Sequence, residues 1–183
     1  LAYSTFDHEW VKQQMKETSV DEVLEKNWPG LHIEPLQAPE NMEVLIGWTG
    51  SPASSPHLVS EVKRLKSDPI FYGKFLDQSN TCVENLIYAF KTNNIKGVQK
   101  MIRQNRSIIQ QMDKEATVDI ETKKLKLLCD IGERFGGAAK TSGAGGGDCG
   151  ITIIDNRVDK HSIYEVWEKE GIKPLKFKIY HGQ

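Results

Sequence analysis

The residues with the clearest chemical potential form a glycine-rich run that begins at Lys140 and ends at Gly150. Five glycines occupy the eight positions 143–150, and they allow positive φ angles and close approach of the backbone to a ligand. Successive N–H groups in such a segment can converge on an anion. Lys140 adds a positive charge, and Thr141 and Ser142 add hydroxyl donors. The run therefore predicts a pocket for a phosphorylated ligand.

A tight turn is the alternative interpretation of the same run, because glycines often only reverse the chain direction. Residues 138–142 and 149–155 are typical of strands, so the glycines lie at a hairpin. A hairpin needs only about two to five loop residues, and the glycine content exceeds that need. No Gly-Lys-Ser/Thr closes the run, so it is not a P-loop. The dinucleotide fingerprint also fails, because its third glycine is missing at Asp148.

Two residues at the end of the run have less chemical promise. A polar residue that leaves a glycine turn usually binds the N–H groups of its own loop, and we expect this of Asp148 rather than catalysis. Cys149 begins an apolar strand, so we expect a packed thiol rather than a nucleophile.

A second stretch, residues 49–56, is rich in Ser and Pro and connects a strand to a helix. Ser54 or Ser55 can cap the helix that Pro56 begins. Hydroxyls at a helix N-terminus can receive an anion, although this composition usually only turns the chain. Both interpretations stay open from the residues alone.

The overall composition excludes several classes of protein. The chain has 183 residues and a net charge of −1, so no basic excess indicates a nucleic-acid partner. No apolar stretch reaches the length of a membrane span, and no membrane partner is expected. The cysteines form no Cys-x-x-Cys pair, and the five histidines show no metal-ligand spacing. These features predict a cytoplasmic protein whose own residues form no metal site.

Alternating and helical apolar patterns predict the elements that position these residues. Strands are expected over residues 1–6, 31–36, 42–48, 138–142, 149–155 and 175–180. Helices are expected after Asp7, over 20–27, from Pro56, and over 68–92, 95–112, 120–135 and 159–170. From Met42 onward the order is strand, helices, β-hairpin, helix, strand. This order predicts an α+β fold, the ferredoxin-like split β-α-β sandwich, with extra helices.

The run Lys-Thr-Ser-Gly-Ala-Gly-Gly-Gly-Asp-Cys-Gly at 140–150 closely resembles the third conserved motif of the GHMP kinases, the galactokinase, homoserine, mevalonate and phosphomevalonate kinases. Its wording looks like that of the bacterial phosphomevalonate kinases. Ile-Gly-Trp-Thr-Gly-Ser-Pro-Ala-Ser-Ser at 46–55 is similar to a second stretch of that subgroup.

This resemblance implies part of an ATP-dependent kinase that converts 5-phosphomevalonate to 5-diphosphomevalonate in isoprenoid biosynthesis. Residues 42–183 would be its C-terminal ferredoxin-like domain, and residues 1–41 a remnant of its N-terminal domain with connecting helices. The implied contacts to the phosphorylated substrate are Ser142, Gly143 and Ala144, with support from Lys140, Gly145, Gly146 and Gly147 and further contacts from Ser51 and Ser55.

The family's nucleotide loop, its N-terminal lysine motif and its Gly-Asp segment with the catalytic aspartate do not occur in this sequence. The resemblance places that aspartate before Leu1, so no catalytic residue is assigned within the chain. ATP and Mg²⁺ would find their main ligands there, and the chain alone is expected to be inactive. The oligomeric state is left open. The alternatives are a non-catalytic ferredoxin-like module that binds a phosphorylated small molecule or a partner protein, and a dimerisation domain.

Overall fold

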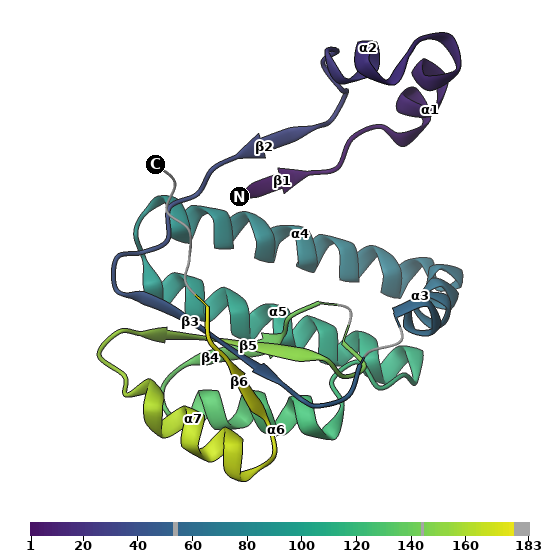
Figure 1. The fold of residues 1–183 in the computed structure, drawn as a ribbon. Helices are drawn as coiled ribbons and strands as arrows, with labels where there is room; N and C mark the ends of the chain where they lie inside the picture. The colour runs from purple at the N-terminus through teal and green to yellow at the C-terminus, as the bar shows by residue number, and fades with distance from the viewer. Residues whose placement is uncertain (53–54, 144, 178–183) are drawn as a thin grey trace. The chain divides into compact units, whose positions relative to one another are not determined.

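The computed structural model describes residues 1–52, 55–143 and 145–177 (Figure 1). The chain divides into two compact units, Leu1–Gln37 and Ala38–Gln183. The assignment of the first segment to the N-terminal domain of a kinase stays a prediction.

The first unit is a two-stranded sheet with two helices. Strand β1 (Ala2–Ser4) pairs antiparallel with β2 (His32–Glu34), and helices α1 (His8–Glu17) and α2 (Val20–Leu24) lie between them in the chain. Asp7 caps α1 as expected, because its carboxylate accepts from the N–H groups of Glu9 and Trp10. Helix α2 ends earlier than the predicted residue 27, since the indole N–H of Trp28 turns back to the carbonyl of Val23.

The second unit contains a four-stranded sheet in the order β4-β5-β3-β6 (Figure 1). Its strands are β3 (Met42–Trp48), β4 (Ala138–Thr141), β5 (Cys149–Asp155) and β6 (Lys173–Leu175), and every neighbouring pair is antiparallel. The first and third strands of the unit lie in the centre, and the second and fourth lie at the edges. This arrangement confirms the ferredoxin-like sandwich predicted from the element order.

Helices connect the strands of this unit, and several begin directly after a residue that caps them. They are α3 (Ser55–Arg64), the 3₁₀ turn η1 (Leu65–Ser67), α4 (Pro69–Lys91), α5 (Ile95–Ala116), α6 (Lys123–Arg134) and α7 (Lys160–Lys169). Asp68, Asn94, Thr122 and Asp159 each accept hydrogen bonds from N–H groups in the first turn that follows. Helix α6 ends at Arg134, and Gly136 just beyond it has a φ of 86°, which lets the chain turn away.

The two faces of the sheet bury two hydrophobic clusters. Leu45, Ile154 and Trp167 belong to the cluster under α6 and α7. Val44 and Ile153 face α5 instead, since successive residues of a strand point to opposite faces. Helix α4 packs on α5, on the side away from the sheet (Figure 1). Strand β5 therefore lies between two helical layers.

Two further predicted boundaries are wrong. Ile120 is not part of a helix: α6 begins at Lys123, and Ile120 is a buried residue of the preceding loop. The last strand covers Lys173–Leu175 rather than 175–180, of which residues 178–180 lie outside the described chain. Pro174 pairs there with Gly47, which an edge strand tolerates because its outer side needs no N–H donor.

Candidate functional site

The glycine run forms the connection between β4 and β5, as predicted. The N–H of Ser142 donates to the carbonyl of Cys149 at 3.0 Å and extends the ladder by one pair. Beyond this pair the backbone becomes left-handed, with φ values of 79° at Gly145, 76° at Gly146 and 58° at Asp148. These angles explain why the loop is rich in glycine, since residues with a Cβ atom rarely adopt a positive φ.

Some amide groups of this hairpin are occupied by the protein itself. The N–H of Gly146 donates to the carbonyl of Ile120 at 2.7 Å, and the N–H of Asp148 donates to the carbonyl of Ser51 at 2.6 Å. Within the described chain, the N–H groups of Gly143, Gly145 and Gly147 donate no hydrogen bond. Gly143 is also exposed, so its amide is the accessible donor of the set.

The two stretches singled out in the sequence meet at this point. Besides the hydrogen bond between Ser51 and Asp148, a Cβ at Gly147 would lie 2.9 Å from the carbonyl oxygen of Ser51. Leu58 of α3 packs over Gly146, where a Cβ would lie 2.6 Å from its Cδ1 atom. Residues 49–52 and α3 therefore form one wall beside the hairpin.

The glycines of the hairpin differ in why they must be glycine. A Cβ at Gly145 would lie 2.3 Å from the carbonyl oxygen of Ile120, a contact that the backbone cannot relieve. A Cβ at Gly143 would meet no atom within 4 Å, and its φ is not positive. The fold therefore requires Gly145, whereas it places no such demand on Gly143.

The polar side chains at the base of the hairpin are more buried than the sequence suggested. Lys140 is half-buried, its Nζ donates to the carbonyl of Thr141 at 2.7 Å, and burial lowers the pKa of its ammonium. The hydroxyls of Thr141 and Thr49 are buried and have no hydrogen-bond partner in the described chain. Ser142 is exposed and is the hydroxyl of this group that a ligand can reach.

Asp148 and Cys149 interact with each other. Asp148 is exposed, and the thiol of Cys149 donates to its carboxylate across 3.7 Å. In the described chain the Asp148 carboxylate accepts from no N–H of its own loop, contrary to the expectation. Burial and the neighbouring carboxylate raise the pKa of Cys149, which disfavours a nucleophilic thiolate.

Two predicted contacts cannot be placed. Ala144 lies outside the described residues. Ser55 is the first residue of α3, but the description does not extend to its side chain. Ser51 is exposed, and its carbonyl rather than its hydroxyl contacts the hairpin.

Sequence reasoning missed the group of residues that holds the Ile120–Glu121 peptide, whose carbonyl accepts from Gly146. Asp113 of α5 accepts hydrogen bonds from the N–H groups of Ile120 and Glu121, at 2.8 and 3.1 Å. The Glu121 carboxylate in turn accepts from Arg106 and Gln110. We call Arg106, Gln110, Asp113 and Glu121 the α5 clamp. The spacing of its α5 members, 106, 110 and 113, places them on one helical face and was the available signal.

The α5 clamp extends to α6 through a further ion pair. The Arg106 guanidinium contacts Asp130 at 2.8 Å, and Lys126 pairs with the same carboxylate. Although burial acts to raise it, these hydrogen bonds from Lys126 and Arg106 hold the pKa of Asp130 below its ordinary value. The Asp130 carboxyl therefore stays ionised at neutral pH.

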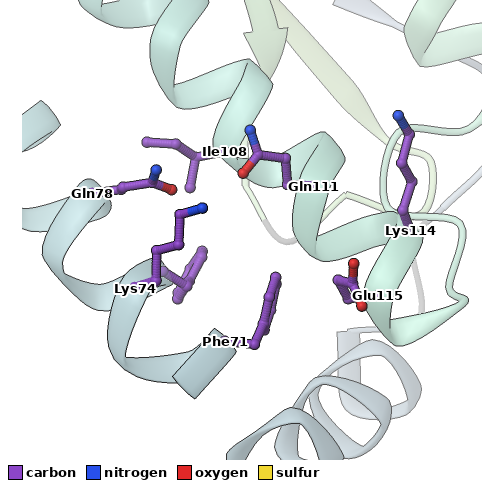
Figure 2. Close-up of a pocket in the computed structure, with 8 residues that line it drawn as sticks. Phe71, Lys74, Gln78, Ile108, Gln111, Lys114 and Glu115 are labelled. Atoms are coloured by element: carbon purple, nitrogen blue, oxygen red, sulfur yellow. The ribbon is translucent and has the colours of Figure 1, made fainter. Parts of the chain in front are cut away.

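A separate cavity of about 200 Å³ lies between α4 and α5 (Figure 2). Figure 2 shows Phe71, Lys74 and Gln78 on the α4 side and Ile108, Gln111, Lys114 and Glu115 on the α5 side, and Phe75 completes the lining. None of these residues belongs to the hairpin or to the α5 clamp. The cavity is thus distinct from the candidate phosphate site.

In the described residues, no group of three or more His, Cys, Asp or Glu side chains is arranged to hold a metal ion. In the same part of the chain, no helix has both the length and the apolar character needed to cross a membrane.

Comparison with known families gives a consistent match. Residues 86–173 match the family described as GHMP kinases C terminal. The chain is 35% identical over 178 residues to the phosphomevalonate kinase of Streptomyces sp. strain CL190, covering 96% of this chain and 48% of that protein.

Solved structures show the same fold. The Lin0012 protein of Listeria innocua has a TM-score of 0.87 and 38% identity, covering 98% of this chain and 52% of its own. The Streptococcus pneumoniae phosphomevalonate kinase in complex with phosphomevalonate and AMPPNP has a TM-score of 0.79 and 27% identity, covering 95% and 50%. This chain therefore spans about half the length of the relatives it matches.

Proposed function

This chain carries a GHMP kinase C-terminal domain, and we propose that it forms part of an ATP-dependent kinase that phosphorylates 5-phosphomevalonate to 5-diphosphomevalonate. The proposal draws on the likeness to two phosphomevalonate kinases, one of which binds phosphomevalonate and the ATP analogue AMPPNP. The proposed role in isoprenoid biosynthesis rests on the same assignment of the substrate.

The main support for the proposal is which N–H groups of the hairpin already donate to the protein and which do not. Gly146 and Asp148 anchor the loop through protein carbonyls, whereas Gly143 presents an N–H without a protein acceptor beside the exposed hydroxyl of Ser142. Converging donors on a fixed backbone suit a phosphate group. We assign Ser142, Gly143 and Ala144 to the substrate phosphate, with Gly145, Gly146 and Gly147 as support for the turn that presents them.

The remaining predicted contacts have narrower roles in this proposal. Lys140 supplies positive potential from a half-buried position rather than a direct contact, because its Nζ already donates to Thr141. Ser51 supports the hairpin through its carbonyl and can add its exposed hydroxyl. Ser55 at the start of α3 is kept as a substrate-side contact on the resemblance alone.

The reaction needs little covalent help from these residues. An oxygen of the 5-phosphate attacks the γ-phosphorus of ATP, a new P–O bond forms, the bond to the bridging β–γ oxygen breaks, and ADP leaves. Phosphoryl transfer of this kind depends mainly on positioning and on neutralising charge. The hairpin holds the attacking phosphate and offsets its negative charge through N–H donors.

We assign the binding of ATP and Mg²⁺ mainly to residues outside this chain. The described residues supply no carboxylate cluster that fits a Mg²⁺ ion, and the sequence has no Gly-Leu-Gly-Ser-Ser-like nucleotide loop. We accordingly propose that this chain alone transfers no phosphate. Its three cysteines are free thiols, which supports a reducing compartment such as the cytoplasm.

The test uses the intact protein that contains this chain, supplied with ATP, Mg²⁺ and 5-phosphomevalonate. We expect ADP release together with a new diphosphate signal in the phosphorus NMR spectrum. Ser142→Ala should raise the KM for phosphomevalonate, and Gly146→Val should raise it more, because valine at a φ of 76° strains the anchored turn. Mevalonate serves as the control substrate and should not be consumed.

Unchanged affinity and turnover in both variants would remove the hairpin from the site. Binding of phosphomevalonate without ADP release would favour the non-catalytic module. Phosphate transfer by the isolated chain would overturn the proposal that ATP and Mg²⁺ are bound mainly by residues outside it.

A further inference from the structure

We propose that the α5 clamp positions the glycine hairpin for substrate, acting through the carbonyl group of Ile120. Arg106, Asp113 and Glu121 are then positioning residues, since none of them belongs to the hairpin. The clamp matters for catalysis only if the hairpin binds the substrate phosphate, so its catalytic role rests on the proposed function.

The orientation of one peptide group connects the clamp to the hairpin. The carbonyl of Ile120 and the N–H of Glu121 belong to the same planar trans peptide and point in opposite directions. Asp113 accepts from that N–H at 3.1 Å. The Ile120 carbonyl must therefore point away from Asp113, and on that side it accepts from the N–H of Gly146 at 2.7 Å.

Asp113 also fixes the preceding amide. Its second carboxylate oxygen accepts from the N–H of Ile120 at 2.8 Å, so one side chain holds two successive N–H groups. The Ile120 side chain is buried, and its packing prevents the loop around it from rotating. A single carboxylate on α5 thereby sets the position of the peptide on which the hairpin rests.

The Glu121 side chain holds the same peptide from its other end. The Arg106 guanidinium forms a forked pair with its carboxylate at 2.5 and 3.0 Å, and Gln110 adds a contact at 3.1 Å. The side chains of Arg106 and Glu121 are only 11% and 4% exposed. Buried forked pairs of this kind have one preferred geometry, which lysine cannot reproduce.

The hairpin follows the Ile120 carbonyl closely. Because a Cβ at Gly145 would lie 2.3 Å from that oxygen, only glycine allows this approach. A shift of the Ile120 peptide must then move Gly145 and Gly146 together. Misplacement of about 1 Å at a binding group is enough to weaken a reaction by about a hundredfold.

The alternative is that the clamp only ties α5 to α6. Arg103 offers a matched control, since it lies one turn earlier on α5, pairs with Glu133 of α6 at 2.6 Å and donates to the carbonyl of Gly137. It ties the same two helices and has no contact with Ile120 in the described chain. Arg106→Lys and Arg103→Lys thus make the same chemical change with and without the connection to the Ile120–Glu121 peptide.

The experiment combines amide hydrogen exchange with kinetics on the intact protein. In Asp113→Asn and Arg106→Lys we expect exchange at the Gly146 N–H to be faster by about tenfold, with the central amide of Leu45 unchanged. The KM for phosphomevalonate should rise about tenfold with kcat and the KM for ATP nearly constant. Arg103→Lys should leave all of these values unchanged.

Unaltered Gly146 exchange in Asp113→Asn, or equal acceleration in Arg103→Lys, would overturn the positioning role. Faster exchange without any change in the KM would confine the clamp to structural support and also overturn it. If the wild-type protein does not turn over phosphomevalonate, the proposed function fails, whereas the exchange data still decide whether the clamp holds the hairpin.

Discussion

Gly47 of β3 and Gly150 of β5 lie directly opposite one another, and the side chain of Leu128 fills the space beside both. A Cβ at Gly47 would lie 2.8 Å from the Cδ1 atom of Leu128, and a Cβ at Gly150 would lie 2.7 Å from its Cδ2 atom. The paired glycines let α6 approach the sheet closely. This approach brings the loop before α6, including Ile120, to the end of the sheet that carries the hairpin.

We expect Gly150→Ala to destabilise the fold by about 1–3 kcal/mol, because the added methyl group overpacks against Leu128. The free energy of unfolding in urea measures this change. Gly73→Ala is the control, since a Cβ at Gly73 meets no atom within 4 Å and alanine favours a helix by about 0.5–1 kcal/mol. Equal effects of the two substitutions would contradict the packing explanation.

Gly143→Ala and Gly145→Ala should separate the needs of the fold from those of the ligand. Gly143→Ala should keep the thermal midpoint, because its Cβ has free space, but should weaken phosphomevalonate binding at the exposed amide. Gly145→Ala should lower both the thermal midpoint and the affinity for phosphomevalonate, because the added Cβ would collide with Ile120 and the φ is 79°. Thermal unfolding and a substrate titration give the two readouts. A large loss of stability in Gly143→Ala would show that the fold also needs this glycine.

Acid should destabilise the second unit through Asp155. Its side chain accepts from Arg157 and from the amide of Asn41, and the hydrogen bonds from Arg157 hold the pKa of Asp155 well below its ordinary value of 3.8. The folded carboxyl thus binds fewer protons than the unfolded one. Its contribution is complete above the unfolded pKa and is lost as the pH falls toward the folded pKa.

Asp155→Asn should therefore be less stable than the wild type at neutral pH and should lose less stability on acidification. Denaturation curves at successive pH values measure both effects. Asp77→Asn, the same change at an exposed position on α4, is the control. Parallel curves for the wild type and Asp155→Asn would refute the assignment.

The thiols should differ in their reactivity toward an alkylating reagent. Burial raises the pKa of Cys129 to about 12 and also raises that of Cys82, so neither should react while the chain is folded. Half-buried Cys149 should react slowly, and Asp148→Asn should accelerate it, because removal of the carboxylate lowers the thiol pKa. Mass spectrometry of the labelled peptides measures the relative rates at which the three thiols react. Rapid labelling of Cys149 in the wild type would identify it as an activated thiol.

Local sequence signals were sufficient to predict the sheet and the hairpin. Short apolar runs indicated β3 and β5, the caps Asp7 and Asp68 placed helix starts, and the element order predicted the ferredoxin-like sandwich. Ile120 was misplaced because an apolar residue at helical spacing matches a helix stripe even when Thr122 caps the helix after it. Such a stripe cannot distinguish a buried loop residue from a helical one.

The contacts of the candidate site depend on residues distant in the sequence, which no local pattern encodes. The carbonyl of Ser51 meets the N–H of Asp148, and the carboxylate of Asp113 meets two loop amides, only after the sheet and helices have packed. The resemblance to a family associated residues 46–55 with the hairpin. It gave no indication of the α5 clamp, which uses ordinary helix residues.

The anchoring of Gly146 and Asp148 has a thermodynamic consequence for any ligand of the hairpin. Because these two hydrogen bonds already hold residues 145–148 in the free chain, binding should cost little conformational entropy at these residues. A preorganised loop also has no slow closing step of its own. Association with a small phosphate ester should then be fast, and any slow phase would arise elsewhere in the protein.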